Sequence, residues 1–149
     1  MVIWIDGDAC PNQIKEILFK AAIRTKTKLI LVANHFVKLP PSLFITRQIV
    51  EQGFDVADNS IVEQLQKQDL VITADIPLAN DVLEKGGIAL NPRGELYTPE
   101  NIKHILAMRN FNESLRETGI LNSGPPKLST QNNQKFSNQL DKILQKRST

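Results

Sequence analysis

The sequence has 149 residues, of which 41% are hydrophobic and 23% are charged, and its formal net charge is +2. These proportions are typical of one globular domain with a sizeable core, and they exclude a disordered or fibrous chain. The single cysteine excludes an intrachain disulfide and a cysteine-based zinc site. No apolar run approaches the roughly 18 residues of a membrane span, and the first residues lack the pattern of a signal peptide. We therefore expect a cytoplasmic protein without a membrane contact.

The predicted elements begin with a short apolar run, Val2–Ile5, which is too brief for a helix and ends at Asp6 and Asp8. This pattern predicts a buried strand followed by an acidic turn. Pro11 suits the first position of a helix. The helix is supported by apolar residues at helical spacing, namely Ile14, Ile17, Leu18, Ala21 and Ala22.

Four further apolar runs predict strands at residues 29–33, 44–50, 69–73 and 88–90. Helical spacing and capping signals predict helices over about 57–65, 77–85 and 99–115. Residues 119–133 are rich in Gly, Pro, Ser, Asn and Gln and predict a linker, and residues 136–144 predict a short terminal helix. We interpret residues 1–149 as a single domain, with an α/β body at 1–118 and an extension at 119–149. Its fold class is α/β, with a mainly parallel sheet of about five strands and helices on both faces.

Polar side chains follow several of these strands. Because parallel strands end at one edge of the sheet, Asp6, Asp8, Asn34 and Asp75 should lie along the same edge. Asp58, near the start of the helix at 57–65, can join them. Clustered carboxylates repel one another and lose hydration, and a divalent cation offsets both costs. Mg²⁺ or Mn²⁺ held in this way polarises a phosphoryl group and activates water, so the acids point to phosphodiester hydrolysis.

Simpler interpretations exist for three of the four acids. Asp8 and Asp75 each precede a helix that contains an early proline, so either could be a helix cap. Asp58 fits the negative charge that a helix dipole favours. Asp6 is the hardest to explain without a ligand, because it directly ends an apolar strand.

Other candidate residues have weaker support. Asn34 and Thr73 could hydrogen-bond substrate or a carboxylate, and Arg93 could clamp a phosphate or be a solvated loop arginine. We expect Cys10 to be a small buried thiol and His35 to lie at the rim of the site. The basic C-terminal segment, with five Lys or Arg and one acid in residues 119–149, is compatible with nucleic-acid contact.

Several motifs occur in one order along nearly the whole chain: Asp6-x-Asp8-Ala9-Cys10-Pro11, Val32-Ala33-Asn34, Gly53-x-Asp55-Val56-Ala57-Asp58, Asp69–Ala79, Ala89–Glu95, Met108-Arg109 and Phe136–Asp141. Together they resemble the YaiI/YqxD family of uncharacterised bacterial proteins, which is similar to the PIN-like nucleases. The resemblance implies a PIN-like three-layer α/β/α fold and a Mg²⁺ or Mn²⁺ site. The acids of that site would come from the first strand, a middle helix and the fourth strand. Carried onto this chain, they are Asp6 with Asp8, Asp58 and Asp75.

We therefore predict a metal-dependent nuclease whose substrate is nucleic acid, with RNA favoured. The first alternative is a phosphatase with an aspartyl nucleophile, because Asp6-Gly7-Asp8 after a strand also resembles the opening of haloacid dehalogenases. The second is a non-catalytic RNA-binding or regulatory module. An oligomer is possible, and the sequence does not determine it.

Overall fold

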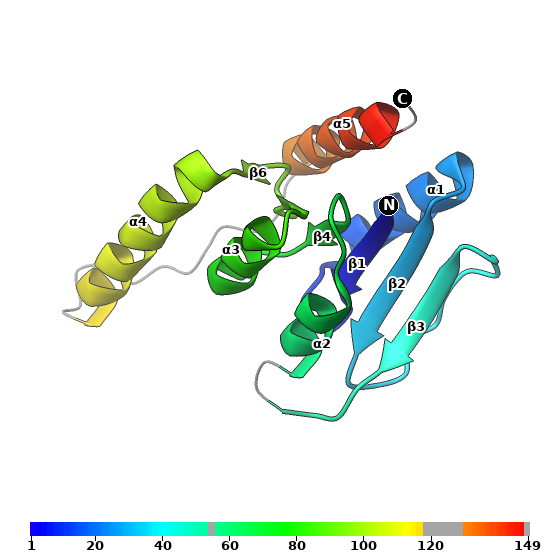
Figure 1. The fold of residues 1–149 in the computed structure, drawn as a ribbon, viewed down its shortest axis with the longest axis horizontal. Coiled ribbons are helices and arrows are strands. Elements are labelled where there is room, and N and C mark those ends of the chain that lie inside the picture. The colour runs from blue at the N-terminus through cyan, green and yellow to red at the C-terminus, as the bar shows by residue number, and fades with distance from the viewer. Residues whose placement is uncertain (54–55, 118–129, 148–149) are drawn as a thin grey trace.

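The protein contains a six-stranded sheet, described here from a computed structural model that covers residues 1–53, 56–117 and 130–147. The sheet order is β3-β2-β1-β4-β5-β6 (Figure 1). Neighbouring strands pair in parallel, except that β6 runs antiparallel to β5. The strands are β1 (Val2–Asp6), β2 (Lys28–Ala33), β3 (Ile45–Ile49), β4 (Leu70–Ile72), β5 (Ile88–Leu90) and β6 (Leu96–Tyr97).

Helices cover both faces of this sheet, which confirms the α/β class with three layers. They are α1 (Asn12–Thr25), α2 (Val56–Gln64), α3 (Ile76–Glu84), α4 (Pro99–Glu117) and α5 (Thr130–Arg147). One apolar cluster joins α1 and α5 to the sheet, and a second joins α2, α3 and α4 to the opposite face. Among the described helices, none is both long and apolar enough to cross a membrane.

Strand β1 lies in the middle of the sheet and contributes side chains to both apolar clusters. Ile3 and Ile5 pack towards α1 and α5, while Trp4 between them packs towards α2 and α3. Side chains alternate across a strand, so a strand covered on both faces must be apolar at every interior position. This requirement explains the unbroken apolar run that precedes Asp6.

The predicted strands and helices can be compared directly with those of the structure. All five predicted strands and four of the predicted helices match the structure to within about two residues at most ends. Thr98 caps α4 as its sequence suggests, because its hydroxyl accepts a hydrogen bond of 3.1 Å from Asn101 N. Strand β6 is additional. It has only two residues, too few for a periodic signal, and it is held by its pairing with β5.

Helix α5 returns the end of the chain to the body. Phe136, Leu140 and Leu144 are buried in the cluster with α1. Gly94 allows this close contact, because it has φ +90° and a Cβ atom there would lie 2.7 Å from the Phe136 nitrogen. The helix starts six residues earlier than its apolar pattern predicts, since its first turns are polar and partly exposed. Most of the predicted linker lies in residues 118–129, outside the described residues.

Candidate active site

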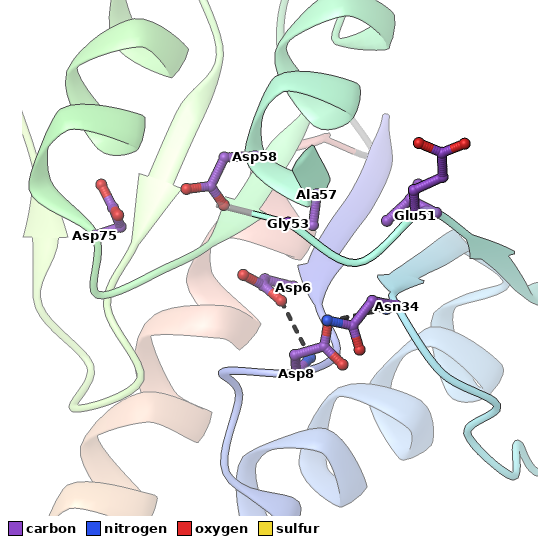
Figure 2. A pocket seen from close by; sticks show the side chains of 9 residues that line it. Asp6, Asp8, Asn34, Glu51, Gly53, Ala57, Asp58 and Asp75 are labelled. Atoms are coloured by element: carbon purple, nitrogen blue, oxygen red, sulfur yellow. Dashed lines mark hydrogen bonds between the residues drawn. The ribbon is translucent and has the colours of Figure 1, made fainter. Parts of the chain in front are cut away.

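A pocket of about 260 Å³ lies where the parallel strands end (Figure 2). The ends of β1, β2, β3 and β4 and the start of α2 all contribute to it. Its lining residues are Asp6, Asp8, Asn34, Val50, Glu51, Gly53, Ala57, Asp58 and Asp75. All four acids that the sequence singled out therefore line one pocket, although they come from three distant parts of the chain.

Asp6 is the last residue of β1 and is partly buried. Its Oδ1 accepts a hydrogen bond of 3.0 Å from Asp8 N, which holds the turn after the strand. Burial raises the pKa of the Asp6 carboxyl, and the negative charges of Asp8 and Asp75 raise it further. The ionised form of Asp6 is thus disfavoured by its surroundings, which a bound cation would reverse.

Asp8 does not cap α1, so that interpretation is wrong. The cap position of α1 is Pro11, which makes no side-chain hydrogen bond. Instead, Asp8 Oδ2 accepts a hydrogen bond of 2.9 Å from Asn34 N. Its Oδ1 lies 2.7 Å from His35 Nδ1. Asp8 therefore connects the turn after β1 to the turn after β2, and both of its oxygens are engaged.

Asp75 does cap a helix, and its position also faces the pocket. Asp75 Oδ1 accepts a hydrogen bond of 3.0 Å from Leu78 N in the first turn of α3. Its own N–H donates to Thr73 Oγ1 at 2.9 Å. Asp58 lies in the first turn of α2. Figure 2 shows the side chains of Asp6, Asp58 and Asp75 around the same pocket.

The three predicted substrate-binding residues have different positions. Asn34 lines the pocket. Thr73 is buried behind it, with 6% of its surface exposed, and orients Asp75 through the hydrogen bond described above. Arg93 is not among the lining residues, and its Nη1 lies 3.5 Å from the side-chain oxygen of Asn132 in α5.

One acidic residue that lines the pocket, Glu51, was not predicted as part of the site, and the partner of His35 was not predicted. Glu51 follows β3 just as Asn34 follows β2, so strand-end position was a usable signal, and its carboxylate points away from the three aspartates (Figure 2). His35, expected only at the rim, pairs with Asp8 across the chain and keeps 60% of its side chain exposed. No spacing in the sequence identifies such a pair, because 27 residues separate its members.

Cys10 is excluded as a nucleophile by its surroundings. The thiol is buried, and burial raises its pKa to about 12. A thiol with this pKa is protonated at neutral pH and unreactive. Cys10 instead packs in the cluster with α1, as the sequence suggests.

The pocket is an open arrangement of acids. Within residues 1–53, 56–117 and 130–147, no three His, Cys, Asp or Glu side chains are grouped closely enough to hold a metal ion unaided. Mg²⁺ is commonly bound through one or two carboxylates, with water and substrate phosphate as its other ligands. The oxygen-only donors of this pocket suit such an ion better than they suit zinc, which favours closed sites with nitrogen or sulfur ligands.

Comparison with known proteins identifies close relatives over nearly the whole length. The sequence family described as "Uncharacterized BCR, YaiI/YqxD family" matches residues 4–146. UPF0178 proteins of Pectobacterium atrosepticum and Marinomonas sp. are each 58% identical, over 97% and 99% of both chains. A UPF0178 protein of Yersinia enterocolitica is 59% identical over 97% of this chain and 95% of its own. No solved structure gives a significant match.

Proposed function

This chain belongs to the YaiI/YqxD family, and we propose that it is a metal-dependent phosphodiesterase that cleaves nucleic acid, with RNA as the favoured substrate. The observation that carries the proposal is the meeting of Asp6, Asp58 and Asp75 at one pocket. The three carboxylates come from β1, α2 and the end of β4, and although Asp75 also caps α3, their negative charges lie around one pocket. Their convergence is explained if they bind Mg²⁺ or Mn²⁺.

Each side chain has a distinct part in this proposal. Asp6 and Asp75 would hold the ion, and Asp58 would contact it through water. Asp8, whose oxygens are engaged by Asn34 N and His35, keeps the turn after β1 in place. When bound, the ion would supply charge stabilisation and an activated water for attack on phosphorus.

The pocket itself favours this reaction over an aspartyl phosphatase. The residues that line it include no lysine or arginine within the described part of the chain. A phosphoenzyme at Asp6 would need a lysine or arginine beside the transferred group in addition to a divalent ion, and the lining supplies neither side chain. Trapping a phosphoaspartate at Asp6 would revive the phosphatase alternative.

The test is cleavage of labelled RNA and DNA with Mg²⁺ or Mn²⁺ by the native protein and the variants Asp6→Asn and Asp75→Asn. Asparagine also caps helices, so Asp75→Asn preserves α3 and removes only the charge. We expect each variant to lose about 10²–10³-fold in rate. The matched control is Asp81→Asn, at an exposed position of α3 outside the pocket, which should retain the native rate.

Native-like cleavage by Asp6→Asn would overturn the proposal. Absence of cleavage by the native protein, with every metal and both nucleic acids, would favour the non-catalytic RNA-binding alternative. A direct measurement of Mn²⁺ binding by calorimetry separates the two, because the catalytic proposal requires binding that Asp6→Asn weakens.

A further inference from the structure

The charge of this protein is divided unevenly between its two helical layers. Residues 12–28, which include α1, contain five basic and one acidic residue, for a net charge of +4. Residues 130–147, which form α5, contain four basic and one acidic residue, for a net charge of +3. The two segments together are +7, whereas the whole chain is +2, so everything else sums to −5. We call the solvent side of α1, residues 26–28 and α5 the basic face.

The two helices of the basic face run side by side. Near their starts, Asn133 Nδ2 donates to Gln13 Oε1 at 2.7 Å. Near their ends, Arg24 Nη2 donates to Asp141 Oδ1 at 2.7 Å. Both helices therefore point the same way across one face of the sheet, from the edge that holds the acidic pocket towards the opposite edge.

Its cations form a row along each helix. Lys20 shares a stripe of α1 with Gln13 and Arg24, seven and four residues away. Lys135, Lys142 and Lys146 lie at the same seven- and four-residue steps on α5, and all three are exposed. At 1.5 Å per residue this second row extends about 16 Å, the length of about five base-pair steps of a duplex.

Several of these charges are available to a partner. Lys20 and Lys142 are exposed, and within the described residues no carboxylate lies within ion-pair distance of either. Arg24 and Lys135 are paired, with Asp141 at 2.7 Å and with Glu95 at 4.0 Å, but both pairs are solvent-exposed and therefore weak. Rows of exposed cations are the electrostatic footprint of polyanion binding.

The apolar sides of α1 and α5 indicate whether the basic face suits an anionic membrane or a nucleic acid. A helix that binds an anionic membrane inserts an apolar face below its cations. Here the apolar side of α5 is committed to the core through Phe136, Leu140 and Leu144. The basic face offers charge without apolar surface to insert, which fits a nucleic-acid backbone better than a lipid surface.

We propose that the basic face of α1 and α5 binds the sugar-phosphate backbone of a nucleic acid whose chain continues to the acidic pocket. The inference rests on the proposed function in taking a nucleic acid as the substrate, and it adds the surface that supplies affinity. Such a surface is needed because the pocket residues are acidic and repel phosphate. Binding at the basic face does not require the pocket to be catalytic.

The test is fluorescence anisotropy with a labelled single-stranded RNA of about 20 nucleotides, in EDTA and over a series of salt concentrations. We expect the double variant Lys20→Gln/Lys142→Gln to bind about tenfold more weakly, with a log–log salt slope reduced by about 1.4. The matched control is Lys67→Gln/Lys103→Gln, which removes two exposed lysines away from the basic face and should retain native affinity and slope. Circular dichroism checks that both variants are folded.

Equal affinity and equal slope for the two double variants would overturn the inference. So would binding of phosphatidylserine vesicles through Lys20 and Lys142 without any binding of RNA. Asp6→Asn separates this inference from the proposed reaction, because it should bind RNA at least as tightly as the native protein. If the native protein binds RNA through the basic face but never cleaves it, the reaction fails and the surface stands. If cleavage depends on Asp6 but Lys20 and Lys142 are irrelevant to binding, the surface fails and the reaction stands.

Discussion

Two aspartates at opposite edges of the sheet show how differently one residue type can be used. Asp69 precedes β4 at the edge where the parallel strands begin, and only 5% of its surface is exposed. It accepts hydrogen bonds from Val2 N at 2.9 Å, Trp4 Nε1 at 3.1 Å and Gln66 N at 3.1 Å. Asp6 ends β1 at the other edge, where its neighbours are Asp8 and Asp75 and its pKa is raised.

The difference separates an acid that stabilises the fold from an acid that is a candidate for ligand binding. Asp69 is surrounded by donors, so its charge is compensated and it joins β1 to the start of β4. Asp6 is partly buried and lies near the carboxylates of Asp8 and Asp75, so its ionisation lowers the free energy of unfolding. An acid kept in a setting that disfavours its charge is a candidate for function, whereas a satisfied acid is accounted for by structure alone.

Replacing Asp69 should have the largest effect on stability. Asp69→Ala leaves three N–H groups without their acceptor, and we expect the free energy of unfolding to fall by about 3 kcal/mol. Urea denaturation measures this loss. The control is Asp81→Ala on the exposed side of α3, where the change should stay within about 0.5 kcal/mol. A loss for Asp69→Ala no larger than the control would contradict the structural role of Asp69.

Gly94, in the turn between β5 and β6, is a second position where we expect a substitution to reduce stability, because the backbone of α5 packs against it. Gly94→Ala places a Cβ 2.7 Å from Phe136 N at a residue with φ +90°. We expect a loss of about 2 kcal/mol and weaker docking of α5. Thermal unfolding gives the loss, and hydrogen exchange of α5 amides locates it. Unchanged protection in α5 would show that the helix tolerates the added methyl group.

Replacing Asp6 should raise the free energy of unfolding, whereas replacing Asp69 or Gly94 should lower it. Because its pKa is raised, the folded state keeps the Asp6 proton to higher pH than the unfolded state does. The free energy of unfolding therefore falls as pH rises from the ordinary aspartate pKa to the raised one, and the full cost is present above that range. Asp6→Asn removes the cost, so we expect a gain of up to about 1 kcal/mol at pH 7, after allowance for solvent screening.

The pH dependence sharpens that prediction. The gain from Asp6→Asn should disappear below the ordinary aspartate pKa, where the native carboxyl is protonated in both states. Chemical denaturation of both proteins over a pH series measures it. A gain that does not depend on pH would mean that charge is not its cause.

The smallest effect is expected at His35. Its pair with Asp8 is largely exposed, and His35→Gln should change the free energy of unfolding by about 0.5 kcal/mol or less. Thermal unfolding at low and high salt measures it, with His104→Gln, on the exposed side of α4, as the control. A loss several times larger would show that the Asp8–His35 pair stabilises the pocket edge more than its exposure suggests.

Local patterns were sufficient to predict most of the fold. The apolar runs of β1, β2 and β4 are strands because both faces of the sheet are covered, and a covered strand must be apolar throughout. Strand β6 and the first turns of α5 escaped prediction, since each depends on a tertiary contact. Strand β6 is held by its pairing with β5. The first turns of α5 are joined to α1 by the hydrogen bond between Asn133 and Gln13.

For the candidate site, parallel topology alone brought the strand-end acids to one edge, so the sequence by itself determined that Asp6 and Asp75 would share a pocket. It could not assign their individual roles. Only the tertiary structure decided that Asp8 pairs with His35 and does not cap α1, that Arg93 lies beside Asn132, and that Asn34 meets Asp8. The physical reason is that strand and helix periodicity are properties of neighbouring residues. Hydrogen bonds, burial and the resulting charge at a site depend on which distant segments the completed sheet brings together.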